Sequence, residues 1–175
     1  MLSILIPTYN YSIFNLVSIL NEQCLKLKIK FEIIVLDDAS ELFHIENNEV
    51  NKLENCTYAI LEKNSGRSSI RNLLAQKASF ENLLFLDADT IPLSEYFVSN
   101  YISNLNLEEK IIYGGIKYQK EKPEENKILR WVYGKSREAL SVYERNKNPY
   151  LSFLTLNFLI KKSVFEKVTF NEKKY

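Results

Sequence analysis

The chain has 175 residues, of which 46% are hydrophobic and 26% are charged, a balance typical of a globular protein with one domain. The formal net charge of +1 gives no overall attraction to nucleic acid or to an anionic membrane. The longest apolar run, residues 151–160, contains three polar residues and is much shorter than the roughly 20 residues of a membrane-spanning helix. We therefore expect no membrane span and have no electrostatic reason to expect nucleic-acid binding.

Two features bear on the cellular compartment. The first ten residues, MLSILIPTYN, have no basic start and their apolar run is broken by proline, so we expect no signal peptide. Cys24 and Cys56 lie in apolar segments and are expected to be buried free thiols. These features favour a cytoplasmic protein, and peripheral attachment to the inner face of the cell membrane stays open.

Strands and helices alternate through the first half of the chain. The expected elements are a strand over 2–7, a helix over 13–27, strands over 31–36 and 58–60, a helix over 68–79 and a strand over 83–86. Ser12 is a candidate N-cap of the first helix. The alternation predicts an α/β fold in which helices cover both faces of a mostly parallel central sheet.

The second half of the chain is less regular. Ser94 is a candidate cap for a helix that carries Phe97 and Tyr101, and residues 111–115 predict another strand. Residues 117–148 hold nine Lys or Arg against five Glu. We expect this segment to be a solvated helical excursion, with an anion-binding patch as the alternative.

All four aspartates lie in two clusters that directly follow predicted strands, Asp37-Asp38 and Asp87-Ala88-Asp89, whereas the eighteen glutamates are scattered. In parallel sheets, ligands bind outside the carboxyl ends of the strands, where both clusters are expected. The turn after the first strand, PTYN, lies at the same edge and has no glycine, so neither a Rossmann glycine fingerprint nor a Walker phosphate loop is present.

A divalent cation bound by Asp87 and Asp89 would neutralise a phosphorylated ligand without a glycine loop. Mg²⁺ is held by one or two carboxylates together with substrate phosphates, and Mn²⁺ suits the same oxygen ligands. On an extended chain, residues i and i+2 point to the same side, so the two carboxylates are expected to face one way. A structural turn is the alternative explanation of this Asp-x-Asp triplet.

Four motifs in this order, SILIPTYN, FEIIVLDDAS, NSGRSSIRN and NLLFLDAD, resemble the amino-terminal, nucleotide-binding half of family two glycosyltransferases with the GT-A fold. Further on, NFLIKKSVFEKVTFNE resembles the segment that the family places before its acceptor-side helix. The resemblance extends over nearly the whole chain and is weakest around residues 117–148.

This resemblance assigns the base of a nucleotide-diphosphate sugar to the first turn and the second strand. Pro7, Thr8 and Tyr9 would pack around the base, and Asp37 would accept a hydrogen bond from the N3–H of uracil. Asp38 would either share this role or cap the following turn.

The resemblance also assigns the diphosphate and the metal. Arg71 would approach the base and the diphosphate, since a guanidinium offers forked donors to phosphate oxygens, and Arg67 would assist. Asp87, Ala88 and Asp89 match the Asp-x-Asp motif of the family. Asp89 would bind the metal directly, and Asp87 would contact the ribose or the metal shell.

The implied function is metal-assisted transfer of a sugar, with inversion, from a UDP-sugar to a hydroxyl of a saccharide or lipid-linked saccharide in polysaccharide biosynthesis of the cell envelope. The family takes its catalytic base from a Glu-Asp motif, and this chain has no such dipeptide. We therefore expect residues 1–175 to form a single GT-A-like domain of a longer enzyme, and we expect the catalytic base to follow Tyr175. The alternatives are a non-catalytic nucleotide-binding module and a nucleotidyltransferase, and PTYN argues against the latter because it lacks glycine.

Overall fold

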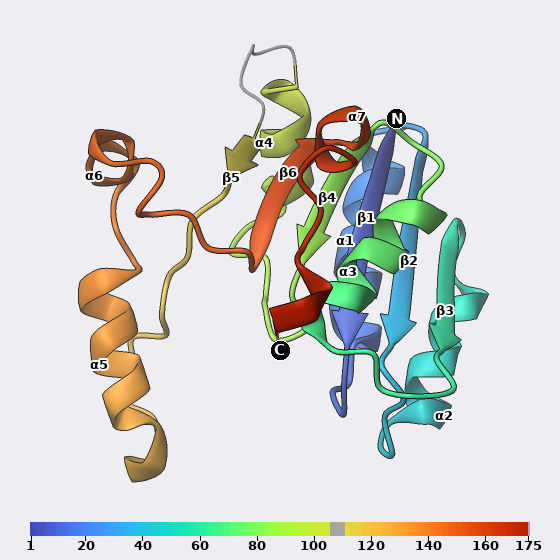
Figure 1. Ribbon diagram of the computed structural model, residues 1–175, viewed down its shortest axis with the longest axis horizontal. Helices are drawn as coiled ribbons and strands as arrows, with labels where there is room; N and C mark the ends of the chain where they lie inside the picture. The colour runs from blue at the N-terminus through green and yellow to red at the C-terminus, as the bar shows by residue number, and fades with distance from the viewer. Residues whose placement is uncertain (106–110, 175) are drawn as a thin grey trace.

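The structure is a computed structural model that describes residues 1–105 and 111–174, so Tyr175 lies outside the described part of the expected domain. The strands in these ranges form one six-stranded sheet in the order β3-β2-β1-β4-β6-β5 (Figure 1). They are β1 (Leu2–Thr8), β2 (Phe31–Asp37), β3 (Cys56–Ile60), β4 (Asn82–Leu86), β5 (Ile111–Tyr113) and β6 (Asn157–Lys161).

The sheet is parallel on one side and antiparallel on the other. β1 pairs in parallel with both β2 and β4, and β2 pairs in parallel with β3. β6 runs antiparallel to β4 and to β5. Because successive strands extend from β1 toward β3 and the chain then returns to the other side of β1, the strand order reverses between β1 and β4. Ligands of open α/β sheets bind at such a switch point.

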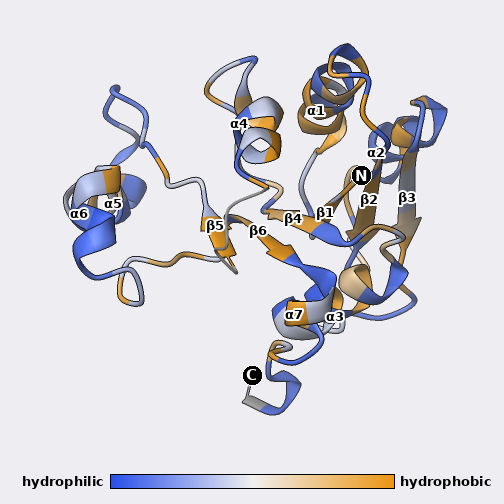
Figure 2. Cartoon of the chain, turned by 90° about the horizontal axis from the view of Figure 1, so that it is seen from above, coloured by the Kyte–Doolittle hydropathy of each residue, from blue (hydrophilic) through white to orange (hydrophobic). Residues whose placement is uncertain are grey.

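Helices cover both faces of the sheet, as expected from the sequence. α1, α2 and α4 lie on one face, and α3 and α7 lie on the other (Figure 2). In the described ranges no helix is long and apolar enough to cross a membrane. The helices are α1 (Phe14–Lys26), α2 (His44–Asn48), α3 (Arg67–Lys77), α4 (Phe97–Ser103), α5 (Ile128–Arg137), α6 (Val142–Lys147) and α7 (Lys162–Phe165), with short 3-10 turns η1 (Glu49–Lys52), η2 (Glu125–Lys127) and η3 (Glu172–Lys174).

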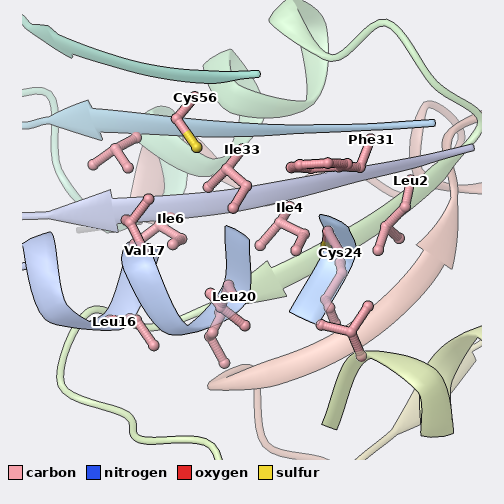
Figure 3. Packing of buried hydrophobic residues seen from close by; sticks show 14 of the residues in the cluster. Leu2, Ile4, Ile6, Leu16, Val17, Leu20, Cys24, Phe31, Ile33 and Cys56 are labelled. Carbon is pink, nitrogen blue, oxygen red and sulfur yellow. The ribbon is translucent and has the colours of Figure 1, made fainter. Parts of the chain in front are cut away.

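Two hydrophobic cores form because successive strand side chains point to opposite faces. In β1, Ile4 and Ile6 pack toward α1 (Figure 3), whereas Leu5 packs toward α3. In β4, Phe85 belongs to the core on the α3 side, where it stacks on Phe158 with ring centroids 4.9 Å apart. The two cores bury residues 2–6 of β1 and 83–86 of β4 on both faces, which explains why these two strands are largely apolar.

The two predicted helix caps are wrong. Ser12 makes no cap bond, because the side-chain oxygen of Asn47 accepts from the backbone N–H just before α1, at 3.0 Å. Ser94 does not cap α4 either, because Gln23 Oε1 accepts from the Val98 N–H at 3.0 Å. In both places an amide side chain that is distant in sequence satisfies the free backbone donor.

Residues 116–151, which we call the arm, connect β5 to β6 and contain α5 and α6. Both helices lie apart from the sheet in two perpendicular views (Figures 1 and 2). Gly134 is the only buried residue of these two helices. The expected helical excursion is therefore confirmed.

The two buried cysteines predict a loss of stability in alkaline solution. Burial, together with the nearby Cys56, raises the pKa of Cys24 to about 12, and burial raises that of Cys56 to about 11 despite a hydrogen bond from Asn21. Above the ordinary thiol pKa of 9.0, thiols ionise in the unfolded chain and not in the native one. The free energy of unfolding should fall by roughly 1 kcal/mol per thiol and pH unit, until the native thiols ionise. Urea unfolding from about pH 8 to about pH 10 measures this slope, and the double variant Cys24→Ala, Cys56→Ala should show a flatter one.

Candidate functional site

The end of β1 contributes the first part of the candidate site. Thr8 is buried, and its carbonyl oxygen accepts from the Asp38 N–H at 2.9 Å, which ties the end of β1 to the residue after β2. Tyr9 directly follows and is 54% exposed. Pro7 is half-buried. The three residues expected to surround a base thus combine a fixed backbone with one exposed aromatic ring.

Asn10 is a structural residue of this turn that the sequence analysis did not single out. Its backbone has a φ of +50°, and its side-chain oxygen accepts from the N–H groups of Glu41 and Leu42 at 2.8 and 3.2 Å. Its own N–H donates to Ser40 Oγ at 2.7 Å. Asparagine tolerates the left-handed region, and this preference was the available signal. Asn10 therefore holds the loops after β1 and β2 together.

Asp37 is fully buried, and both of its carboxylate oxygens have partners. Oδ1 accepts from the Ser40 N–H at 2.8 Å, and Oδ2 accepts from the Tyr58 hydroxyl at 2.6 Å. Burial and the bond to Asp37 raise the pKa of Tyr58, so this hydroxyl stays protonated and remains a donor. Asp37, not Asp38, caps the turn after β2, and the turn-capping alternative for Asp38 is wrong.

Asp38 instead fixes the start of α3. Oδ1 accepts from the Ser65 N–H at 2.6 Å and from its hydroxyl at 2.8 Å, and Oδ2 accepts from the Gly66 N–H at 2.9 Å. Gly66 has a φ of +84°, a conformation that glycine adopts without strain. The two aspartates have different partners because side chains alternate along β2. Asp37 points to the α1 face of the sheet, and Asp38 points to the α3 face.

Arg71, one helical turn into α3, forms an ion pair with Asp87 at the end of β4. Its side chain is only 9% exposed, and Nη1 donates to the Arg67 carbonyl at 2.9 Å. The Phe170 ring lies against the guanidinium, 5.7 Å from ring centroid to Cζ. Nε of Arg71 is buried and has no partner in the described part of the chain. A buried donor of this kind can be satisfied by a ligand.

The Asp-x-Asp triplet lies in a turn and is not extended, so the expectation that its carboxylates align along a strand is wrong. The Asp87 carbonyl accepts from the Thr90 N–H at 3.2 Å and from its hydroxyl at 2.6 Å. Asp89 is exposed, and the half-buried Ala88 packs against the core. Burial raises the pKa of Asp87, the Arg71 charge opposes this shift, and the Asp89 charge adds to it. The two carboxylates are therefore electrostatic neighbours despite the turn.

A contact between α3 and the C-terminal segment was also missed. Asn72 Nδ2 donates to the Phe170 carbonyl at 2.9 Å and to Glu172 Oε1 at 2.7 Å, and the Phe170 N–H donates to Asn72 Oδ1 at 3.0 Å. The only signal in the sequence was an asparagine inside a predicted helix, because asparagine is unfavourable there unless its side chain has a specific partner. This contact places Phe170 on Arg71.

The structure brings the expected site residues to one edge of the sheet. The register pairs Leu5 of β1 with Phe85 of β4, so the residues that follow each strand lie beside the switch point. Arg71 joins them from α3. The Arg67 carbonyl accepts from Arg71, and the Arg67 charge acts to lower the pKa of Asp87. No group of three or more His, Cys, Asp or Glu that could hold a metal occurs in residues 1–105 and 111–174.

This strand order puts carboxylates and an arginine at the switch point, where open α/β sheets bind their ligands. Comparison with family models identifies the family. The chain belongs to glycosyl transferase family 2, whose model matches residues 3–169. The family resemblance noted in the sequence is confirmed. A comparison with curated proteins found no match.

Solved structures of glycosyltransferases share the fold at low sequence identity. TarS 1-349 of S. aureus matches with a TM-score of 0.64 and 18% identity, over 98% of this chain and 50% of that one. Mannosyltransferase PcManGT from Pyrobaculum calidifontis, in complex with GDP-Man and Mn²⁺, matches with a TM-score of 0.61 and 17% identity, over 98% and 48%. Glucosyl-3-phosphoglycerate synthase from Mycobacterium tuberculosis, in complex with Mn²⁺, UDP and glucosyl-3-phosphoglycerate, matches with 0.60 and 15%, over 94% and 58%. The chain thus spans about half the length of these proteins.

The hydrogen bonds of Asp38 predict that this residue is needed for stability. Asp38→Ala removes the acceptor of three donors at the start of α3, which should lower the free energy of unfolding by about 2 to 3 kcal/mol. Urea unfolding measures the change. Glu41→Ala, which removes an exposed carboxylate from the same loop region, should change it by less than about 0.5 kcal/mol. Equal losses in the two variants would contradict this role of Asp38.

Proposed function

We propose that this chain binds a nucleotide-diphosphate sugar, with a UDP-sugar favoured, as the donor half of an inverting glycosyltransferase. The observation that carries the proposal is the buried guanidinium of Arg71, which is paired with Asp87 at the switch point and whose Nε has no partner among the residues that the structure describes. Family membership supports it. So do the nucleotides UDP-GlcNAc, GDP-Man and UDP that structurally similar glycosyltransferases bind in their crystal structures.

The base of the nucleotide is assigned to the ends of β1 and β2. Tyr9 offers an exposed ring at this edge, and Pro7 and Thr8 hold the backbone below it. Asp37 keeps acceptor capacity, since each carboxylate oxygen has two lone pairs and only one donor bonded to it here. The Tyr58 hydroxyl orients this carboxylate, which we propose as the acceptor for uracil N3–H; because Asp37 is fully buried, this contact requires the turn above it to open.

The diphosphate is assigned to Arg71. Its charge is permanent, and its position at the first turn of α3 places it next to the N-terminus of the helix, where anions are favoured. Asp87 holds the guanidinium in a fixed orientation, so little side-chain entropy remains to be lost when a phosphate binds. The same ion pair keeps the half-buried Asp87 compensated before the donor arrives.

Asp87 and Asp89 are suitable ligands for a divalent cation, Mn²⁺ or Mg²⁺. These ions prefer oxygen ligands, and the carboxylate of Asp89 is exposed at the site. Two carboxylates would fill only part of the coordination shell, and water and phosphate would fill the rest. When bound, such an ion would neutralise the diphosphate and stabilise the charge that develops on the leaving nucleotide. We assign direct ligation to Asp89 and a supporting contact to Asp87, which is already paired with Arg71.

Transfer also requires a base that takes the proton from the acceptor hydroxyl. The Glu-Asp dipeptide that supplies it in the family does not occur in this chain. We therefore propose donor binding, and not complete transfer, as the activity of these 175 residues. The sugar acceptor is a saccharide or lipid-linked saccharide by the same family reasoning.

Asp89→Asn should reduce metal-dependent nucleotide binding. Isothermal titration of UDP in the presence of Mn²⁺ should show at least about tenfold weaker binding in this variant, because a carboxylate ligand is lost. Binding without metal should not change. Glu166→Gln, an exposed carboxylate on the α7 side, is the matched control and should bind like the wild type. Wild-type binding of UDP that is equally strong with and without Mn²⁺ would contradict the assigned role of Asp89.

Arg71→Lys should separate diphosphate recognition from base recognition. The variant keeps the charge but loses the forked donors, so UDP binding should weaken by about tenfold while uridine binding stays the same. Titrations of both ligands against one protein sample measure the difference, and thermal unfolding checks that α3 remains folded. A parallel loss for uridine and UDP would show that Arg71 acts only on the fold of the site.

A further inference from the structure

The arm carries an apolar stripe that faces solvent. Leu129, Val132, Tyr133 and Ser136 follow the i, i+3, i+4, i+7 spacing that places residues on one face of α5. The three apolar members are 85%, 52% and 58% exposed. An amphipathic helix usually packs such a face against a core, whereas this face of α5 is exposed and the helix itself lies apart from the sheet (Figure 2).

Contacts on the other side of α5 fix this outward orientation. Trp131 Nε1 donates to the Gln119 carbonyl at 2.9 Å, and Gly134 lies so close to the Tyr118 ring that a Cβ would be 2.0 Å from its Cζ. Glu138, just after α5, accepts from both guanidinium nitrogens of Arg130 at 2.9 Å. These contacts hold the other side of α5 against residues of the arm itself, and the apolar stripe stays exposed within the described chain.

The rest of the arm extends the exposed apolar surface. Val142 and Tyr143 on α6 are 62% and 74% exposed, and Tyr150 and Leu151 are 96% and 87% exposed. Arg145 anchors α6 to the sheet, because its Nη1 donates to the carbonyl of Tyr113 in β5 at 3.1 Å. Tyrosines with an exposed apolar ring and a polar tip are typical of surfaces that contact the membrane–water boundary.

Positive charge is concentrated in the same segment. The whole chain has a formal net charge of +1, whereas the arm holds nine Lys or Arg against five Glu, so the rest of the chain is net negative. The described residues of the arm form two ion pairs, Lys127 with Glu124 and Arg130 with Glu138. The other cations have no carboxylate partner within 4 Å in the described chain, and they are Lys117, Lys120, Lys122, Lys135, Arg137, Arg145 and Lys147.

From this combination we infer that the arm docks on an anionic lipid surface through the apolar stripe of α5 and the exposed residues of α6. Apolar insertion and attraction of Lys and Arg to acidic headgroups act together in peripheral helices. A second copy of the chain is disfavoured as the partner, because a symmetric contact would bring two arms of net charge +4 together. The negative remainder of the chain would be repelled by the same surface, which orients the arm toward it.

Vesicle flotation tests this inference. The full chain should bind vesicles of equal parts phosphatidylcholine and phosphatidylglycerol, bind pure phosphatidylcholine at least about tenfold less, and dissociate as salt is raised. The variant Leu129→Ser, Tyr133→Ser should lose about tenfold in binding to the mixed vesicles. Ile45→Ser, a 90% exposed apolar residue on α2, is the matched control and should bind like the wild type.

A second variant tests the charges. Lys135→Glu, Arg137→Glu should weaken binding about tenfold or more, and Lys77→Glu on α3 should have a smaller effect. Circular dichroism and thermal unfolding confirm that each variant is folded. Equal binding to both vesicle types, or wild-type binding by the α5 variants, would overturn the inference. A dimer in sedimentation velocity that dissociates in Leu129→Ser, Tyr133→Ser, without vesicle binding by the wild type, would assign the surface to a second copy.

Discussion

The registers of β1 with β2 and with β4 decide where the polar groups at the strand ends fall. Leu5 pairs with Phe85, so β1 and β4 end at the same edge of the sheet. α3, which precedes β4 in the chain, packs over β1. Because side chains alternate along each strand, the residues that follow are sorted between the two faces of the sheet. Asp38 and Asp87 both fall on the α3 side, where Ser65, Gly66 and Arg71 meet them.

This arrangement places a charged pair in which Arg71 is nearly buried and Asp87 is half-buried. Removing an ion from water is costly, and the cost is recovered only when the geometry is good and the buried donors and acceptors are satisfied. In Arg71, Nη1 and Nη2 have partners, whereas the buried Nε has none in the described chain. The donor without a partner in the described chain suits an anion, and the neighbouring exposed carboxylate suits a cation. A metal-bound diphosphate would supply both charges.

Apolar runs and their spacing were enough to predict the strands of the first half, the large helices, and the helices on both faces, because burial decides these features. The helix caps could not be predicted, since Asn47 and Gln23 reach the free backbone donors from other elements. The roles of Asp37 and Asp38 were not separable in sequence either, because adjacent residues differ only in the face to which they point. Likewise, nothing local links Asn72 to Phe170, which lies 98 residues away.

Arg71 and Asn72, which are neighbours in α3, contact different parts of the chain. Arg71 is directed to the candidate nucleotide site, whereas Asn72 binds the backbone and side chains of the C-terminal segment. Whatever orders Arg71 also restricts the ring of Phe170 that lies on it. If occupancy of the site shifts Arg71, it also changes the contact with Phe170, and by linkage the C-terminal segment then affects binding at the site by the same free energy.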